Sequence, residues 1–488
     1  MSLYTVDEPE LQFANGRHVC PTAGIATHGV YDAEVEYGLD SIRVGGIGTP
    51  EDLRLLNEWL SRCSKGIDAP PKAHPLLFPS FPGFTQHTGF QAELIHEEGL
   101  VRSIPKMKIE EAVREGPIHN QRVENLTSLY LNEVEHLAEH RPVDVIVCVT
   151  PDFLEDILID KETDSDNSAS GPSENSSVEE GEENPPEKEK RRYNFRRVLK
   201  ARAMHRRIPL QLVWKLNLTE SPDGSQNDAT RAWNFMTALY YKAGPSIPWK
   251  FLEHPDRPRT CFVGLGFYES LDEKKLRTSM AQVFDEMGRS VILRGTPIPE
   301  SEDKRDRRPY LGGEQAHDLL LKALEEYEGA LGHLPARIVV HKTSAYRSEE
   351  IEGLTEAMRK KEIYRADFVN VQPSPLRLYR EGRYPPYRGT ALELEPERHL
   401  LYSRGSVEYY GTYPGQYVPQ PIEVRRARGD SSVQQLTEEV LALTKMNWNN
   451  TRFDGKMPIT IECARKVGEI MRHVDPDETP DVSYRYYM

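Results

Sequence analysis

Hydrophobic residues recur with two different periods along the first half of the chain, and the alternation predicts strands and helices in turn. SIRVGGI at Ser41–Ile47 predicts a short strand that ends in glycines. The apolar period of a helix follows in LRLLNEWLSRC, after Thr49 and Asp52, which fit a capping box. Glu124–His140 predicts an amphipathic helix, and the apolar run VDVIVCV at 143–149 predicts a buried strand. This order indicates a parallel sheet with helices on its faces.

The second half continues the alternation. Strands are predicted at Thr260–Tyr268, Ser290–Arg294, Arg337–His341, Ala366–Val371, Tyr402–Tyr413 and Ile422–Arg426, and helices at Glu314–Leu331, Glu349–Lys361 and Ser432–Leu443. The proline-rich stretch HPDRPR punctuates the two halves, and we place a boundary near Pro255–Pro258. The pattern therefore predicts the α/β fold class with two domains in the 488 residues.

The distribution of charge changes the picture that the total charge suggests. The formal net charge is −15, which by itself argues against a nucleic-acid ligand. However, residues 155–190 hold 13 acidic and 3 basic residues and few apolar ones, which predicts a disordered insertion at about 157–190. The next stretch, Arg191–Lys215, holds nine Lys and Arg residues and no acid. A solvated helix face explains an isolated basic cluster, but the abrupt reversal of charge favours a functional one.

Cysteine usage and hydropathy exclude several classes of protein. The five cysteines, which form no CxxC pair, argue against a disulfide framework and a thiolate zinc site; they are Cys20, Cys63, Cys148, Cys261 and Cys463. No apolar stretch has the length of a membrane span, and the first residues lack the pattern of a secretory signal. We expect a cytoplasmic protein without a membrane partner.

Part of the basic block can form a phosphate pocket. Lys200 lies on a predicted helix that opens near Tyr193 or Asn194, and helix N-termini favour phosphate. Gln211 follows one short loop later, and Lys242 ends the helix AWNFMTALYYK. Two cations and an amide donor are suited to bind phosphate. The alternative explanation of Lys242 is that it only caps the C-terminus of its helix. The turn GGIG at 45–48 lacks the full dinucleotide-binding spacing, so a tight turn explains it.

Longer motifs resemble parts of prokaryotic Argonaute proteins. NFRRVLKARAMHRRIPLQLV at Asn194–Val213, then YYKAGPSIPW at Tyr240–Trp249, is similar to the guide 5′-phosphate pocket of their MID domain. LALTKMNWNNTRFDGKMPITIECARKVGEIM at Leu441–Met471 closely resembles the end of their PIWI domain, and LFPSFPGF, TPDFLED and YPGQYVPQP also fit. The resemblance begins at about Ile42 and runs to the C-terminus.

The resemblance implies a short prokaryotic Argonaute, with a Rossmann-like MID domain and an RNase H-like PIWI domain but no N or PAZ domain. We expect an N-terminal segment at 1–40, the MID domain at 41–255 and the PIWI domain at 256–488. The guide 5′-phosphate pocket would comprise Lys200, Gln211 and Lys242, with Arg196 where many relatives have an aromatic residue. The terminal carboxylate, here that of Met488, would help to hold Mg²⁺ beside the phosphate.

The resemblance also implies that the RNase H-like site has lost its function. Active PIWI domains hold two divalent ions with four residues, mostly carboxylates. In this chain Gly266, Thr343 and Arg465 stand at three of those positions, and Ser344 follows Thr343. Glu269 or Asp272 would have to substitute from beyond the strand. We therefore expect a protein that is not a nuclease.

Relatives of this type imply the partners. We expect a small guide RNA with a 5′-phosphate, a complementary single-stranded DNA target, and an APAZ-domain effector protein that carries a sirtuin-like, TIR or nuclease domain. Target recognition would activate this effector in a heterodimer, commonly as an antiviral defence that depletes NAD and kills the invaded cell. One alternative is a guided nuclease with a noncanonical RNase H-like active site, and another is a structural RNA-binding subunit that searches for no target.

Overall fold

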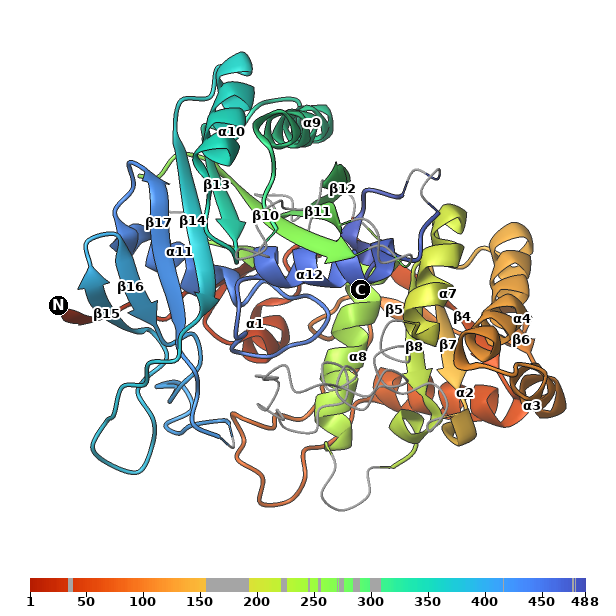
Figure 1. Ribbon diagram of the computed structural model, residues 1–488. Coiled ribbons are helices and arrows are strands. Elements are labelled where there is room, and N and C mark those ends of the chain that lie inside the picture. Colours follow the sequence, from red (N-terminus) through yellow and green to blue (C-terminus); the bar gives the residue numbers. More distant parts are fainter. Residues whose placement is uncertain are drawn as a thin grey trace.

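A computed structural model describes most of the chain (Figure 1). It covers residues 1–33, 38–154, 193–220, 226–244, 246–252, 256–269, 271, 276–283, 290–298, 309–415, 417–475, 478 and 480–488. The acidic insertion predicted at about 157–190 and the residue Asp272 lie outside these ranges. None of the helices within them combines the length and the apolar character that crossing a bilayer requires.

The first half builds a parallel sheet in the order β5-β4-β7-β8, with β6 also paired to β4. The strands are β4 (Ser41–Gly48), β5 (Glu93–Ile95), β6 (Val101–Ser103), β7 (Val145–Thr150) and β8 (Leu210–Trp214). The helices of this half are α2 (Pro50–Lys65), α3 (Lys106–Arg114), α4 (His119–His140), α7 (Phe195–Ala203) and α8 (Asp228–Ala243). The parallel sheet that the sequence predicts is confirmed.

Alternate side chains of β7 enter different cores because successive residues of a strand point to opposite faces of the sheet. Val145, Val147 and Val149 join a cluster with Leu56 of α2 and Met236 of α8. The intervening side chains of β7 join another cluster together with residues of α4 and α7. Both faces of the sheet are thus covered, as in a Rossmann-like fold.

The predicted capping box at the start of α2 is formed. The Thr49 hydroxyl accepts a hydrogen bond from the Asp52 amide at 3.2 Å, and the Asp52 carboxylate accepts one from the Thr49 amide at 3.0 Å. Pro50 occupies the first helical position, where its missing N–H costs nothing. Local sequence therefore determines where this helix begins.

The second half builds a nine-stranded sheet in the order β1-β15-β16-β17-β14-β13-β10-β11-β12. Its strands are β1 (Leu3–Thr5), β10 (Thr260–Glu269), β11 (Leu276–Val283), β12 (Ser290–Ile298), β13 (Arg337–Lys342), β14 (Ala366–Pro373), β15 (Thr390–Glu395), β16 (Arg398–Leu401) and β17 (Ile422–Gly429). β13 pairs in parallel with β10 and β14, and the other pairs are antiparallel.

Helices cover both faces of this sheet as well. They are α9 (Gly313–Leu331), α10 (Ser348–Lys360), α11 (Val433–Leu443) and α12 (Ile459–Met471). Side chains of α9 and α10 form one core with Val263 and Val340, whereas α11 and α12 pack with Val339 and Val369 in the other. Figure 1 shows α8 and α12 between the two sheets.

One strand prediction is wrong. The sequence predicts a strand within Tyr402–Tyr413, but the chain leaves the sheet after β16 and continues in turns and isolated bridges. The side chains of Val407 and Tyr410 pack instead against Phe453 and Cys20, in a small cluster outside the main cores. The aromatic residues that suggested a strand are thus buried by contacts with distant segments.

The N-terminal residues are divided between two sheets. β1 adds an edge strand to the large sheet by pairing with β15. β2 (Leu11–Phe13) joins β3 (Gly16–His18) and β9 (Lys250–Phe251) in a small antiparallel sheet, next to α1 (Pro21–His28). The N-terminal segment therefore contacts both halves of the protein.

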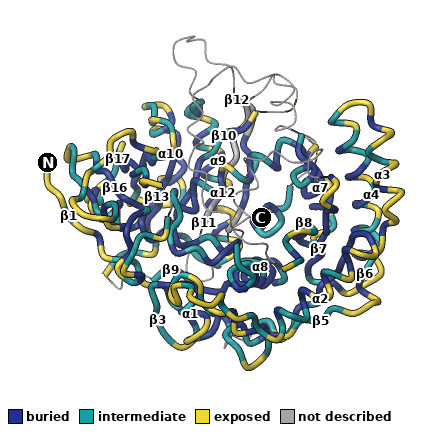
Figure 2. The backbone as a smooth tube through the Cα atoms, turned by 90° about the horizontal axis from the view of Figure 1, so that it is seen from below, coloured by how far each residue is buried: buried dark blue, intermediate teal, exposed yellow. Residues whose placement is uncertain are grey.

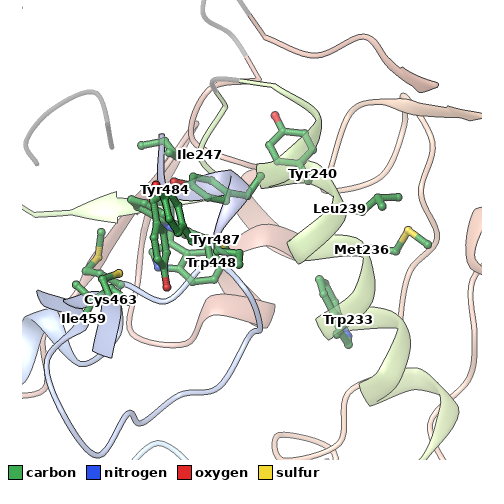
Figure 3. Packing of buried hydrophobic residues seen from close by; sticks show 14 of the residues in the cluster. Trp233, Met236, Leu239, Tyr240, Ile247, Trp448, Ile459, Cys463, Tyr484 and Tyr487 are labelled. Carbon is green, nitrogen blue, oxygen red and sulfur yellow. The ribbon is translucent and has the colours of Figure 1, made fainter. Parts of the chain in front are cut away.

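A single hydrophobic core connects the two halves. It contains Trp233 and Leu239 of α8 together with Trp448, Tyr484 and Tyr487 from the C-terminal part of the chain (Figure 3). Figure 2 shows buried backbone running through the centre of the molecule and exposed backbone along α3 and α4. The continuous core fixes the junction at which the predicted pocket residues lie.

Candidate nucleic-acid interface

The residues predicted to bind the guide phosphate lie on α7, β8 and α8. Lys200, Gln211 and Lys242 come from these three elements, and their exposed fractions are 2%, 7% and 0%. The Lys242 ammonium donates a hydrogen bond to the side-chain oxygen of Gln211. α7 begins at the predicted place, because the Asn194 side chain caps it by accepting a hydrogen bond from the Arg196 amide at 3.0 Å. The fold thus joins Gln211 and Lys242 directly and buries Lys200 on α7.

The electrostatics of this location favour an anion. Burial lowers the pKa of Lys242 well below its usual value, and the positive charges of Arg196 and Lys466 lower it further. Lys242 has no ion pair with a carboxylate among the described residues. A buried ammonium without a counter-ion is costly, so a phosphate group would offset that cost.

Lys466 is a pocket residue that sequence reasoning missed. It lies on α12, in the second half of the protein, and acts on Lys242 through its charge. α12 contacts α7 directly, which explains how a residue from the large sheet reaches the pocket. The run Leu441–Met471 marks the region, but nothing in the local sequence distinguishes Lys466 from its neighbours.

Most of the basic block serves another purpose than the sequence suggests. Arg202 pairs with Glu124 at 2.8 Å, and Arg206 pairs with Glu135 and Glu139 of α4, each at 2.8 Å. The acids of α4 thereby neutralise the outer face of α7. Arg196 is a residue of the block whose charge acts on Lys242, and because others are paired with acids, the number of basic residues overstates the charge available there.

A carboxylate of α12 joins the two halves near the pocket. Glu469 pairs with Arg197 of α7 at 3.1 Å and with Arg465 of its own helix at 2.8 Å. Glu469 thus links α7 to Arg465, one of the positions at which the resemblance places a metal ligand in active PIWI domains. These pairs are partly exposed.

Two of the motifs that carry the resemblance contact each other. The Trp249 indole donates to the Lys445 carbonyl at 3.0 Å, and the Trp448 indole donates to the Trp249 carbonyl at 2.9 Å. Asn234 of α8 accepts from the Thr451 amide at 3.0 Å. The run around Met446–Asn450 is therefore part of the junction that supports the end of α8.

The N-terminal segment also supports the pocket. The Asp32 carboxylate accepts hydrogen bonds from the Tyr240 hydroxyl at 2.7 Å and from the Ile247 amide at 2.8 Å. Tyr240 lies two residues before Lys242 on α8, and Ile247 follows the end of that helix. Sequence reasoning missed Asp32 because 208 residues separate it from Tyr240.

Met488 lies close to this region. Its side chain is 2% exposed and packs in the core that contains Tyr241 and Tyr487. The short helix η6 (Tyr484–Tyr486) contacts α8, and Figure 1 places the C-terminus beside the end of α8 that carries Lys242.

The positions at which the resemblance places RNase H-like metal ligands lie near the carboxyl ends of the parallel strands β10 and β13 of the large sheet. Leu265 is in register with Lys342 at the end of β13, so Gly266, which is still within β10, lies next to the exposed Thr343. A Cβ atom on Gly266 would lie 2.8 Å from the Cβ of Ala464, the neighbour of Arg465.

The packing is closer still two residues earlier on β10. A Cβ atom on Gly264 would lie 2.1 Å from the carbonyl oxygen of Thr460, so α12 rests directly on the strand. Glu269 ends β10 as an exposed residue, three positions beyond Gly266. Within the described part of the chain, no three His, Cys, Asp or Glu side chains are grouped so that they could hold a metal ion.

A buried ion pair lies near the same strand ends. Lys342 pairs with Glu350, and the side chains of both are almost fully buried. Glu350 also accepts hydrogen bonds from the amides of Leu311 at 2.7 Å and Arg347 at 3.0 Å. This pair holds α10 against the end of β13.

Exposed aromatic and arginine residues gather on the loops that follow β14. Tyr379 is 89% exposed, and the Arg380 guanidinium lies 4.0 Å from the ring centre of Tyr387. Arg377 and Arg383 lie on the same loop. Interleaved rings and guanidinium groups suit the bases and phosphates of a single strand.

Comparisons with known proteins identify the fold. No protein-family model matches the sequence, and no curated protein sequence matches it. Among solved structures, Clostridium butyricum Argonaute bound to a guide DNA and a 19-mer target DNA aligns with a TM-score of 0.65 at 16% identity, over 97% of this chain and 53% of that one. Drosophila Piwi aligns with a TM-score of 0.59 at 14% identity, over 99% of this chain and 56% of that one.

Marinitoga piezophila Argonaute in complex with a 5′ OH guide RNA aligns with a TM-score of 0.54 at 12% identity, over 99% of this chain and 59% of that one. The chain thus spans little more than half the length of these Argonaute and Piwi proteins. The predicted α/β architecture is confirmed: the chain has the fold of the MID and PIWI part of Argonaute proteins, in which a Rossmann-like domain precedes an RNase H-like domain.

Proposed function

We propose that this protein binds the 5′-phosphate of a small guide RNA and uses the guide to recognise a complementary single-stranded DNA without cutting it. The observation that carries the proposal is the buried cation cluster at the junction of the two halves. In that cluster Lys242 is completely buried, contacts Gln211 and is acted on by Arg196 and Lys466. Argonaute structures with a bound guide, such as those named above, support a nucleic-acid ligand.

Base pairing would supply the sequence selectivity, and the protein would contact the backbone, as in other guided systems. The exposed aromatic and arginine residues around Tyr379 and Arg380 would contact the paired or displaced strand. Because phosphate contacts release counterions, guide affinity should fall steeply as the salt concentration rises. The choice of RNA as guide and DNA as target rests on the resemblance to short prokaryotic Argonautes.

The close packing of α12 on β10 supports the absence of cleavage. A metal-binding carboxylate at Gly266 would need a Cβ where Ala464 already lies. Thr343 supplies no carboxylate, and Arg465 would repel a divalent cation. A nuclease with a noncanonical acid set remains the competing function, and Glu269 is the described carboxylate that it would have to use.

A protein that recognises a target without cutting it requires an effector. We propose that this effector is an APAZ-domain protein with a sirtuin-like, TIR or nuclease domain, bound in a heterodimer in the cytoplasm. Target binding would activate it in defence against invading DNA, with abortive infection as the outcome. This part of the proposal rests on the resemblance.

A Mg²⁺ ion beside the guide 5′-phosphate is part of the proposal. Mg²⁺ is commonly held by one or two carboxylates together with phosphate oxygens. The terminal carboxylate of Met488 would be the protein ligand and the guide would supply the other oxygens. The cations Lys242, Lys466 and Arg196 repel a metal ion until the phosphate is present, so metal and guide would bind together.

The test compares guides with and without a 5′-phosphate. The double variant Lys200→Ala/Lys242→Ala should bind 5′-phosphorylated RNA at least about tenfold more weakly, because charge-assisted contacts to phosphate are among the strong ones. Binding of 5′-hydroxyl RNA should change little. The matched control is Lys65→Ala/Lys108→Ala, which removes two exposed lysines of the same half. Equal losses for both guides would refute the pocket.

A cleavage assay with Mg²⁺ and with Mn²⁺ tests the remaining part of the function. Guide-loaded protein should leave a complementary single-stranded DNA intact. Guide-dependent cleavage that is lost in Glu269→Gln would establish the nuclease alternative. Binding of guide without any binding of complementary DNA would instead favour a structural RNA-binding subunit.

A further inference from the structure

A cavity lies where the N-terminal segment meets both halves of the protein. Its volume is about 470 Å³, and its walls come from residues 6–10, from residues 251–252, 257–260 and 262, and from α11 with Met446. Residues 251–260 connect the small sheet to the first strand of the large sheet. A cavity of this volume admits one or two side chains of another molecule.

The base of the cavity is apolar. Phe251 and Phe262 contribute aromatic surface, and Leu443 and Met446 contribute aliphatic surface. Phe251 and Phe262 lie with their ring centres 6.1 Å apart, in an edge-to-face arrangement. Burying an apolar side chain against such a surface is favourable.

The charged groups that line the cavity are mostly acidic. Five carboxylates contribute to the walls, against the two guanidinium groups of Arg257 and Arg259; the acids are Asp7, Glu8, Glu10, Glu438 and Glu439. An occupant of the cavity meets the carboxylates that are not already paired with cations of the protein, and an unpaired carboxylate attracts a cation and repels a phosphate.

Three of these acids already serve the fold. Glu8 pairs with Arg388 and Lys445, at 3.0 Å to Arg388, and Glu439 pairs with Arg337 at 2.7 Å. Glu438 pairs with Arg257, and both residues line the cavity. These pairs hold the cavity walls together.

The two remaining acids are exposed. Asp7 and Glu10 belong to the cavity wall but are open to solvent, and neither has an ion pair among the described residues. Their charges are therefore available to an incoming cation. An apolar base with free carboxylates beside it is complementary to an apolar side chain that is flanked by Lys or Arg.

We propose that this cavity is a docking site for a partner protein, which inserts an apolar side chain from a segment that also carries Lys or Arg. The proposal rests on the proposed function in that an effector protein would supply this segment. Nucleic acid is disfavoured because its phosphates would face the carboxylates. An occupant would contact the N-terminal segment, the connection between the halves and α11 at once, and would thereby join the effector to both halves.

A peptide-binding experiment tests the docking site directly. A short fluorescent peptide with a central Leu-Phe pair between lysines and arginines should bind the full-length protein in a saturable manner, which fluorescence anisotropy measures. A peptide with the same apolar pair between glutamates should bind at least tenfold more weakly. A basic peptide without the apolar pair should lose affinity to a similar extent, because it cannot fill the base of the cavity.

Two variants locate the peptide on the protein. Asp7→Asn/Glu10→Gln should weaken binding at least about fivefold at low salt and reduce its salt dependence. Ala442→Phe places a large side chain in the cavity and should abolish binding of the peptide. If Ala442→Phe folds poorly, Asp7→Asn/Glu10→Gln still tests the site, because it changes exposed residues. The matched control is Glu97→Gln/Glu98→Gln, which neutralises two exposed acids on the first half and should leave binding unchanged.

The proposal is overturned if the basic peptide does not bind, if the acidic peptide binds as well, or if neither variant changes the affinity. Binding of 5′-phosphorylated RNA is measured in the same samples. It should remain unchanged in Asp7→Asn/Glu10→Gln, so a failure of the docking site is distinguishable from a failure of the guide pocket.

Discussion

Asp32 and Tyr240 are joined by a hydrogen bond of 2.7 Å, although one lies in the N-terminal segment and the other lies on α8, two residues before Lys242. The second oxygen of the Asp32 carboxylate accepts the Ile247 amide at 2.8 Å. One buried carboxylate therefore holds both the last turn of α8 and the chain that leaves it. The position of Lys242 depends on a residue far away in sequence.

Replacing Asp32 by Asn should disturb the pocket without removing any of its residues. The amide group retains one acceptor, so either Tyr240 or Ile247 loses its partner, at a cost of about 1–3 kcal/mol in the free energy of unfolding. We expect the ratio of affinities for 5′-phosphorylated and 5′-hydroxyl RNA to fall, as measured by filter binding. Asp40→Asn, at an exposed site, is the control. A loss of stability with an unchanged ratio would show that Asp32 has only a structural role.

Binding of the 5′-phosphate should depend on pH through Lys242, whose pKa lies below its usual value because of burial and of the charges of Arg196 and Lys466. A bound phosphate raises that pKa again, so the complex holds more protons than the free protein between the lowered and the ordinary value. Affinity should therefore fall as the pH rises through this window, and level off below it.

Calorimetry in buffers of different ionisation enthalpy measures the proton uptake. The measurements should be made above pH 7, because the second ionisation of a phosphate monoester occurs near about pH 6. Lys242→Met should abolish both the uptake and the slope, and a 5′-hydroxyl guide should show neither. A slope that persists in Lys242→Met would assign the titration to another group.

Restoring an acid at Gly266 should not restore a nuclease. A Cβ at this position would lie 2.8 Å from the Cβ of Ala464, so α12 must shift, and overpacking of this kind costs about 1–3 kcal/mol. Gly266→Asp should lower the urea midpoint of unfolding, and Gly266→Asp/Thr343→Asp should cleave no target with Mn²⁺. Thr343→Asp alone, at an exposed residue, should change stability by less than about 0.5 kcal/mol. A stable and cleaving double variant would contradict this account of the packing.

The buried pair of Lys342 and Glu350 should be important for stability. Glu350→Gln leaves the Lys342 ammonium buried without its counter-charge, which costs about 3–5 kcal/mol. Denaturant unfolding measures the loss. The control Glu58→Gln breaks the exposed pair of Arg54 and Glu58 on α2, which should cost less than about 1 kcal/mol. Equal effects of the two substitutions would show that the buried pair adds no stability of its own.

The sequence by itself determined the elements whose causes are local. Thr49 and Asp52 place the start of α2, the apolar run at 143–149 predicts β7, and Asn194 marks the start of α7, because caps and hydrophobic periods act within a few residues. Lys200, Gln211 and Lys242 are also visible in local motifs, and the resemblance of these motifs predicts a phosphate pocket.

The tertiary structure decided what depends on contacts between distant segments. It brought Lys466 and Asp32 to the pocket, paired Arg202 and Arg206 with acids of α4, and packed the aromatic residues near Tyr410 into a core instead of a strand. Charge counted along the chain could not reveal those pairs, because the partners lie on other helices. Burial and neutralisation are properties of packed surfaces, and they become defined only when the two halves and the N-terminal segment meet.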